Sequence, residues 1–138
     1  MTRADQLTAR DVMRENVITV GAEASLHDAI ELLMQHKISG LPVVDAKQRV
    51  IGVITEKDMV KLLYEPRGKL KKVGDLMVQK VVSFEVDTPL VEICDCLMSE
   101  SFRRVPIVDN GKLVGLISRA DLMPTLLELS QDSLPPEA

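Results

Sequence analysis

The heptapeptides GVITEKD at positions 52–58 and GLISRAD at positions 115–121 share one design. Each begins with glycine, runs through apolar residues to a hydroxyl residue, and reaches aspartate three positions later. Such a pattern is typical of a strand that ends where a helix begins, because hydroxyl and carboxylate groups cap the first backbone N–H groups. A carboxylate can equally accept hydrogen bonds from the two hydroxyls of a ribose. Two interpretations therefore stay open, a helix cap and a binding site.

The duplication extends beyond the heptapeptides in both directions. The matched pairs are DVMRENVITV (11–20) with DLMVQKVVSF (75–84), SGLPVVD (39–45) with RRVPIVD (103–109), and RVIGVITEKDMVKLL (49–63) with KLVGLISRADLMPTL (112–126). The copies are offset by 64 residues at Asp45 and Asp109, and by 63 at Gly52 and Gly115. One residue is therefore missing from a turn of the second copy. Two copies predict a pseudo-symmetric pair rather than a longer array.

Each copy predicts the order strand, helix, strand, strand, helix, which is an α+β (α/β two-layer) fold. We expect first strands at 16–20 and 80–84, and hairpins over 40–55 and 105–118, the second one turning at Asn110-Gly111. The hydroxyls of Ser25 and Thr88 are the expected N-caps of the first helices. Their apolar faces are Leu26, Ala29, Ile30, Leu33 and Met34, and Leu90, Ile93, Cys94, Leu97 and Met98. The last helices are expected at 59–64 and 122–129. The predicted boundaries are repeats at 8–64 and 73–128, a linker at 65–72, and a flexible tail at 129–138.

Composition argues against several classes of function. The formal net charge of −4 and an aromatic content of 2% disfavour nucleic-acid binding. No apolar run reaches the roughly 18 residues of a membrane span, so we expect no membrane insertion and a cytoplasmic protein. Cys94 and Cys96 lack further ligands at metal spacing, which predicts no metal site, a core position for Cys94 and a position nearer the surface for Cys96. Motifs for a nucleophile, a catalytic metal or a phosphate loop are missing, so no enzyme is predicted.

The ordered repetition of both motifs resembles a tandem pair of CBS domains, named after cystathionine β-synthase and often called a Bateman module, of the stand-alone type. The resemblance covers about residues 8–128. It implies two pseudo-symmetric β-α-β-β-α repeats that pack through their sheets into a disc with two clefts. It also implies an adenosine-containing regulatory ligand such as AMP, ADP, ATP or S-adenosylmethionine, no obligatory cofactor, and an unidentified protein partner that the module regulates.

The two predicted clefts differ in charge. The preferred cleft combines the motif acid and hydroxyl with the one adjacent arginine pair of the chain, and a guanidinium can fork onto phosphate. Its residues are Asp121, Ser118, Arg103 and Arg104, with Met13, Ile18, Thr19, Ile38, Ser39 and Leu116 as walls. The second cleft is expected to be weak or empty. Its residues are Asp58, Thr55, Val53, Lys57, Met77 and Val82, with Arg103 reaching across. By the resemblance, Phe102 also lines a cleft.

The alternative function is a pure dimerisation or protein-interaction module with empty clefts. Its basis is the apolar residues of the helices, namely Met34, Met59, Leu63, Met98, Met123, Leu126 and Leu127. Most of them are expected in the core, and the rest on a surface that pairs two copies as a homodimer. The two functions are compatible, since a ligand can bias one dimer arrangement over another.

Overall fold

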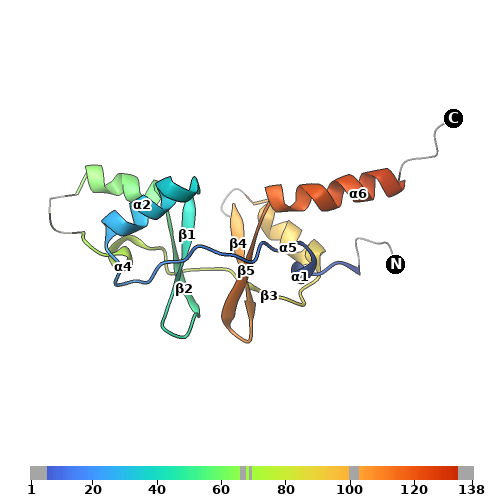
Figure 1. Cartoon of the computed structure of the whole chain (residues 1–138), viewed down its shortest axis with the longest axis horizontal. Helices are drawn as coiled ribbons and strands as arrows, with labels where there is room; N and C mark the ends of the chain where they lie inside the picture. Colours follow the sequence, from blue (N-terminus) through green and yellow to red (C-terminus); the bar gives the residue numbers. More distant parts are fainter. Residues whose placement is uncertain (1–5, 66–67, 69, 100–102, 134–138) are drawn as a thin grey trace. The chain divides into compact units, whose positions relative to one another are not determined.

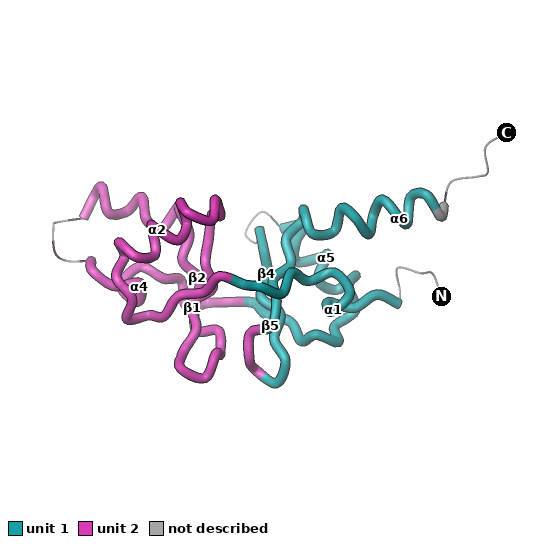
Figure 2. The backbone as a smooth tube through the Cα atoms, in the orientation of Figure 1, with its two compact units in different colours: residues 1–17, 82–110, 114–138 teal, residues 18–81, 111–113 magenta. Residues whose placement is uncertain are grey.

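The structure is a computed structural model that describes residues 6–65, 68, 70–99 and 103–133 (Figure 1). It divides into two compact units (Figure 2). Unit 1 contains residues 1–17, 82–110 and 114–138, and unit 2 contains residues 18–81 and 111–113. Parts of the predicted linker (66–67 and 69) and tail (134–138), and Phe102, lie outside the described residues. Both units mix helices with a small sheet, which confirms the predicted α+β class.

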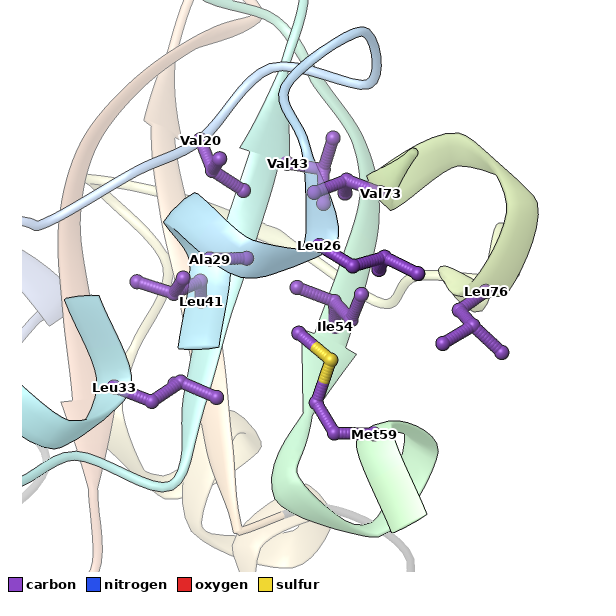
Figure 3. Packing of buried hydrophobic residues seen from close by; sticks show 10 residues of the cluster. All are labelled: Val20, Leu26, Ala29, Leu33, Leu41, Val43, Ile54, Met59, Val73 and Leu76. Carbon is purple, nitrogen blue, oxygen red and sulfur yellow. The ribbon is translucent and has the colours of Figure 1, made fainter. Parts of the chain in front are cut away.

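Unit 2 is built around an antiparallel hairpin. Strand β1 (Gly40–Val44) pairs with β2 (Val50–Thr55), and the register shifts between Val43 and Val44. Helix α2 (Leu26–His36) precedes the hairpin, and α3 (Glu56–Met59), the 3-10 helix η2 (Val60–Leu63) and α4 (Val73–Leu76) follow it. Apolar side chains from both strands and these helices meet in one core (Figure 3). That core contains Val20, Leu26, Ala29, Leu33, Leu41, Val43, Ile54, Met59, Val73 and Leu76.

Unit 1 has the three-stranded order β3-β4-β5. Its elements are α1 (Ala9–Val12), β3 (Phe84–Glu85), α5 (Leu90–Leu97), β4 (Arg104–Asp109), β5 (Lys112–Ser118), the 3-10 helix η3 (Ala120–Leu122) and α6 (Met123–Ser133). Asn110 and Gly111 have φ of 52° and 84°, as a type I′ turn requires, so the predicted hairpin turn is confirmed. The core contains Ala9, Val86, Leu90, Ile93, Leu97, Val105, Ile107, Ile117 and Leu122.

The short helix that begins each repeat belongs to the unit formed mainly by the other repeat. Helix α1 belongs to unit 1, and helix α4 belongs to unit 2. In unit 1 the N–H groups of Ala9 and Arg10 donate to the carbonyls of Thr88 (3.0 Å) and Val86 (3.1 Å). In unit 2 the N–H groups of Val73 and Gly74 donate to the carbonyls of Ala24 (2.9 Å) and Ala22 (2.8 Å), which are the equivalent positions at the offset of 64. Ala9 and Val73 are fully buried in their new cores. The compact units therefore interleave the two repeats.

Several local predictions need correction. Residues 16–20 form no strand, because only Val20 bridges Val43, and of 80–84 only Phe84 enters β3, where it pairs with Ile107. Each of these apolar segments contains the point where the chain leaves one unit for the other, after residues 17 and 81. Helix α5 has Pro89 rather than Thr88 as its N-cap, whereas the Ser25 cap of α2 is confirmed by a 3.0 Å bond from the Asp28 N–H.

The last helices and the apolar helix faces also differ from expectation. The helix of the first repeat starts at Glu56 and continues as a 3-10 helix, and α6 includes residues 129–133, which were predicted to be tail. The buried ridges of α2 and α5 are confirmed except at Met34 and Met98, which are 74% and 80% exposed. Of the seven methionines and leucines expected to be mostly core, Met59 alone is buried. The other six side chains are exposed to solvent.

Candidate functional site

The first motif closes on itself at the end of β2. Thr55 is the N-cap of α3, and its hydroxyl accepts a 3.3 Å hydrogen bond from the Asp58 N–H. The Oδ2 atom of Asp58 accepts from the Thr55 N–H and from the Thr55 hydroxyl, both at 2.9 Å. This reciprocal arrangement is a capping box, and it confirms the helix-cap interpretation of GVITEKD. Asp58 is also the one charged residue buried in the described part of the chain, with 6% of its surface exposed.

The second motif repeats only the acid's part of this arrangement at the end of β5, because η3 has Arg119 as its N-cap without a side-chain hydrogen bond, so the predicted Ser118 cap is wrong. The Oδ2 atom of Asp121 accepts from the Ser118 N–H at 2.8 Å and from the Ser118 hydroxyl at 3.0 Å. Asp121 lies in η3, and its side chain is 9% exposed. The two motif acids are therefore fixed in the same way, each through one oxygen. The second oxygen of each carboxylate is left for another donor, and this is where the copies differ.

The motif glycines let another segment of the chain cross the strand closely. A Cβ atom on Gly115 would lie 2.6 Å from Sδ and 3.0 Å from Cβ of Met13. A Cβ atom on Gly52 would lie 2.8 Å from Sδ of Met77 and 3.0 Å from the Val78 carbonyl oxygen. Real Cβ atoms do not approach other heavy atoms so closely, so these glycines relieve crowding where the two segments cross. They position Met13 and Met77 against the strands that lead to Asp121 and Asp58.

Arg14 is a site residue that the sequence analysis missed. Its backbone forms two hydrogen bonds with Leu116, of 2.8 and 2.9 Å, and its guanidinium Nη2 donates to Oδ1 of Asp121 at 3.0 Å. The Arg14 side chain is 72% exposed, so one end of the ion pair is solvated. The available signal was the alignment of DVMR with DLMV, which places an arginine in one copy where the other has Val78.

The other predicted site residues fall into the two units as follows. Unit 1 contains Met13, Leu116, Ser118 and Asp121, and also Val82, the exposed Arg103, and Arg104 at the start of β4. Unit 2 holds Thr55, Asp58, Val53 and Met77 together, with Lys57 exposed. Ile18, Thr19, Ile38 and Ser39 belong to unit 2, where the Ser39 carbonyl accepts a 2.9 Å bond from the Glu56 N–H. Their place beside Asp121 stays a prediction.

The two cysteines are part of the unit 1 packing. Both are reduced and partly buried, and both pack against its core. Burial raises the pKa of both thiols, and the charge of Asp95 raises that of Cys94 further. No three His, Cys, Asp or Glu side chains gather at metal-binding distance in the described ranges. Among the helices that the structure describes, none has the length and apolar character of a membrane span.

Chemically, each motif carboxylate is an acceptor with one oxygen bonded to its own motif, and in Asp121 the other oxygen also accepts from Arg14. An ionised carboxylate donates no hydrogen bond and offers about four lone-pair positions, so a second oxygen can accept from hydroxyl groups of a ligand. The hydrogen bonds to Oδ2 fix the position of the carboxylate, and the motif itself donates no hydrogen bond to Oδ1. The first copy thus combines a helix cap with an acceptor suited to a sugar hydroxyl, whereas the acceptor of the second copy is shared with Arg14.

Comparison with known proteins gives the family. The model of the CBS domain matches twice, at residues 9–65 and 73–128. Inosine-5′-monophosphate dehydrogenase of Methanocaldococcus jannaschii is 35% identical over 116 residues, which cover 83% of this chain and 23% of that enzyme. The chain spans 63% or less of the length of the first curated relatives that it matches.

Two solved structures share the fold over most of this chain. CBSX2 of Arabidopsis thaliana in complex with AMP has a TM-score of 0.78 and 32% identity, and the match covers 89% of this chain and 98% of CBSX2. The CBS domain pair of protein MJ0100, in complex with 5′-methylthioadenosine and S-adenosyl-L-methionine, has a TM-score of 0.75 and 25% identity, with coverages of 89% and 98%. With two matched repeats over most of its length, the chain belongs to the CBS domain family.

Proposed function

We propose that this chain is a ligand-sensing regulatory module that acts in the cytoplasm and binds an adenosine-containing nucleotide through Asp121 and Asp58. The observation that carries the proposal is the shared geometry of the two acids, each fixed through Oδ2 by its own motif. The second oxygens are suited to ribose hydroxyls. Support comes from the two structural neighbours described above, whose ligands, AMP, 5′-methylthioadenosine and S-adenosyl-L-methionine, all contain adenosine.

The Asp121 site is the preferred site for a ligand that carries phosphate. Unit 1 contains Arg14 on Asp121 and, in addition, Arg103 and Arg104 before and in β4. Guanidinium groups bind phosphate through charge-assisted hydrogen bonds that are about twice as strong as neutral ones. At the Asp58 site the nearby cation in the sequence is Lys57. We therefore assign AMP, ADP or ATP first to Asp121, and leave Asp58 as the weaker site.

A thermal-shift panel tests the proposal. AMP, ADP, ATP, S-adenosylmethionine, NADH and GTP are added separately, and the melting temperature is followed for each. A ligand that binds only the folded state stabilises it by about 2.7 kcal/mol at a hundredfold excess over its Kd, so a rise of several degrees is expected with at least one adenosine ligand. GTP is the control for ribose and phosphate without adenine. Unchanged melting with all adenosine ligands would rule the proposal out.

A second candidate function, homodimerisation, is favoured by exposed apolar side chains. In unit 1 these are Met98, Met123, Leu126 and Leu127, and in unit 2 Met34, Val60, Leu63 and Tyr64, with exposed fractions between 47% and 83%. Leu126 and Leu127 lie on α6, so a helix of unit 1 presents apolar surface that its own core does not cover. Surfaces of this kind commonly mark contacts between proteins.

Sedimentation at low micromolar concentration tests this second function. A dimer has twice the 15.3 kDa of one chain. Leu127→Glu should shift the equilibrium toward the monomer because a charge would be buried at the contact, whereas Glu128→Gln on the same helix should leave the mass unchanged. A 15.3 kDa species alone for the wild-type chain would contradict dimerisation. Both functions combine if ligand binding changes the dimer fraction.

A further inference from the structure

The two motif sites have the same backbone frame and differ in one side chain. Arg14 and Leu116 exchange two backbone hydrogen bonds of 2.8 and 2.9 Å in unit 1. Val78 and Val53 exchange the same two bonds, both 2.9 Å, in unit 2. The preceding methionine of each segment packs over the motif glycine in both copies. Arg14 and Val78 therefore occupy equivalent positions. The two sites differ there in the side chain, which is arginine in unit 1 and valine in unit 2.

This difference in side chain changes the hydrogen bonding of the second carboxylate oxygen, Oδ1. Oδ1 of Asp121 accepts the hydrogen bond from Arg14 at 3.0 Å. Oδ1 of Asp58 accepts no hydrogen bond from any described residue. Val78, at the position equivalent to Arg14, has no donor on its side chain. No buried side-chain oxygen or nitrogen in the described part of the chain lacks a partner, so this oxygen must be reached by solvent. The acceptor is open at Asp58 and occupied at Asp121.

We propose that Arg14 is the specificity-determining residue of the Asp121 site, which it restricts to adenosine ligands that carry an anionic group, whereas Val78 leaves the Asp58 site open to neutral nucleosides. This inference rests on the proposed function. Ribose hydroxyls that bind Oδ1 of Asp121 compete with the guanidinium for that oxygen. A ligand with a 5′-phosphate, one carbon from the ribose ring, offers the displaced guanidinium a new anion. Adenosine offers it none.

The energetics favour such an exchange. Arg14 is 72% exposed, and an ion pair with one solvated partner is weak, so its rupture reduces affinity by at most about fivefold. A guanidinium–phosphate contact is charge-assisted and more than replaces that loss. Since the Arg14 backbone is held by Leu116 and 72% of its side chain is exposed, the guanidinium can leave Asp121 without a change in the backbone. Phosphate ligands should therefore gain affinity at Asp121 relative to adenosine.

Reciprocal exchange of the two side chains tests this directly. Calorimetry with AMP and with adenosine is carried out on Asp58→Asn, which reports the Asp121 site, and on Asp121→Asn, which reports the Asp58 site. Adding Arg14→Val to the first should lower the ratio of AMP affinity to adenosine affinity about tenfold, with weaker AMP binding and adenosine binding up to about fivefold stronger. Adding Val78→Arg to the second should raise the same ratio. Arg10→Val removes an equal charge from the same segment and is the control.

The outcomes separate this inference from the proposed function. If AMP binds but the affinity ratio changes no more with Arg14→Val than with Arg10→Val, the role of Arg14 is overturned while nucleotide binding stands. An equal loss of both ligands on Arg14→Val would also overturn it, because it would show a structural effect without selectivity. If the wild-type chain binds neither AMP nor adenosine, the proposed function fails and the inference with it. Melting without ligand verifies that each variant folds.

Discussion

Replacing Asp121 by asparagine is expected to weaken AMP binding about a hundredfold and to leave the fold intact. The carbonyl oxygen of asparagine can replace Oδ2 and keep the hydrogen bonds from the N–H and hydroxyl of Ser118. The amide NH2 group then takes the place of Oδ1, where it donates and cannot accept from ribose. Loss of two charge-assisted hydrogen bonds, each about 1.5 kcal/mol, corresponds to that factor. Calorimetry with AMP measures it.

The matched variants of this experiment are Asp58→Asn and Asp28→Asn. Asp58→Asn makes the same chemical change in the first motif and should reduce AMP affinity less, because that site is assigned as the weaker one. Asp28 occupies the third position of α2, and Asp28→Asn removes the same charge near a helix start outside the motifs. A larger loss with Asp58→Asn would reverse the assignment of the sites. Equal affinity for all three variants would remove the motif acids from binding altogether.

Replacing Gly115 by valine is expected to destabilise the fold by about 3 kcal/mol. The new Cβ atom would meet Cγ of Met13 at 2.9 Å and Cβ at 3.0 Å, and only the sulfur end of that side chain can move away easily. Overpacking of this kind costs about 1–3 kcal/mol, and the γ-methyl groups of valine place the cost at the upper end. Chemical denaturation in urea gives the free energy of unfolding.

Gly21→Ala is the control for the glycine substitution, since its nearest neighbour, the Val44 carbonyl oxygen, lies 3.9 Å away. It should change stability by about 0.5 kcal/mol or less. Because Arg14 follows Met13, Gly115→Val should also displace the guanidinium from Asp121 and so alter the selectivity described above. If Gly115→Val were as stable as Gly21→Ala, the close crossing of Met13 over β5 would be wrong.

Local signals in the sequence were enough for the motifs and hairpins. Asn110-Gly111 specifies its turn through two residues that tolerate positive φ, and Thr55 with Asp58 specifies a capping box. These features depend on residues within a few positions of one another. Repetition then identified equivalent positions and the family. The cap and the proposed binding acid were visible as one pattern because they use the same side chains.

Features that depend on distant parts of the chain were not predicted. Nothing near Ala9 or Val73 in the sequence indicates that each short helix is buried in the core of the other repeat. For the same reason the apolar segments at 16–20 and 80–84 looked like strands, although the chain passes from one unit to the other within them. The ion pair between Arg14 and Asp121 joins residues that are 107 positions apart. In the sequence, the difference between Arg14 and Val78 at aligned positions was the one sign of this ion pair.

The methionines show the limit of an apolar pattern on a helix. Met34 and Met98 each end a run of residues spaced to face one core, yet both are exposed. Each lies one position beyond a buried leucine, Leu33 or Leu97. Periodicity defines a helix face but not how far a small core extends beneath it. Whether such residues contact a second copy is a question for sedimentation.

A crystal structure of the chain grown with AMP would show whether the motif carboxylates bind the ribose of an adenosine nucleotide. We expect ribose hydroxyls within about 2.6–3.0 Å of Oδ1 of Asp121, with Oδ2 still bonded to Ser118 and the Arg14 guanidinium moved onto the phosphate. AMP bound with its ribose away from both Asp121 and Asp58, or a motif oxygen still paired with Arg14 beside a bound nucleotide, would contradict it.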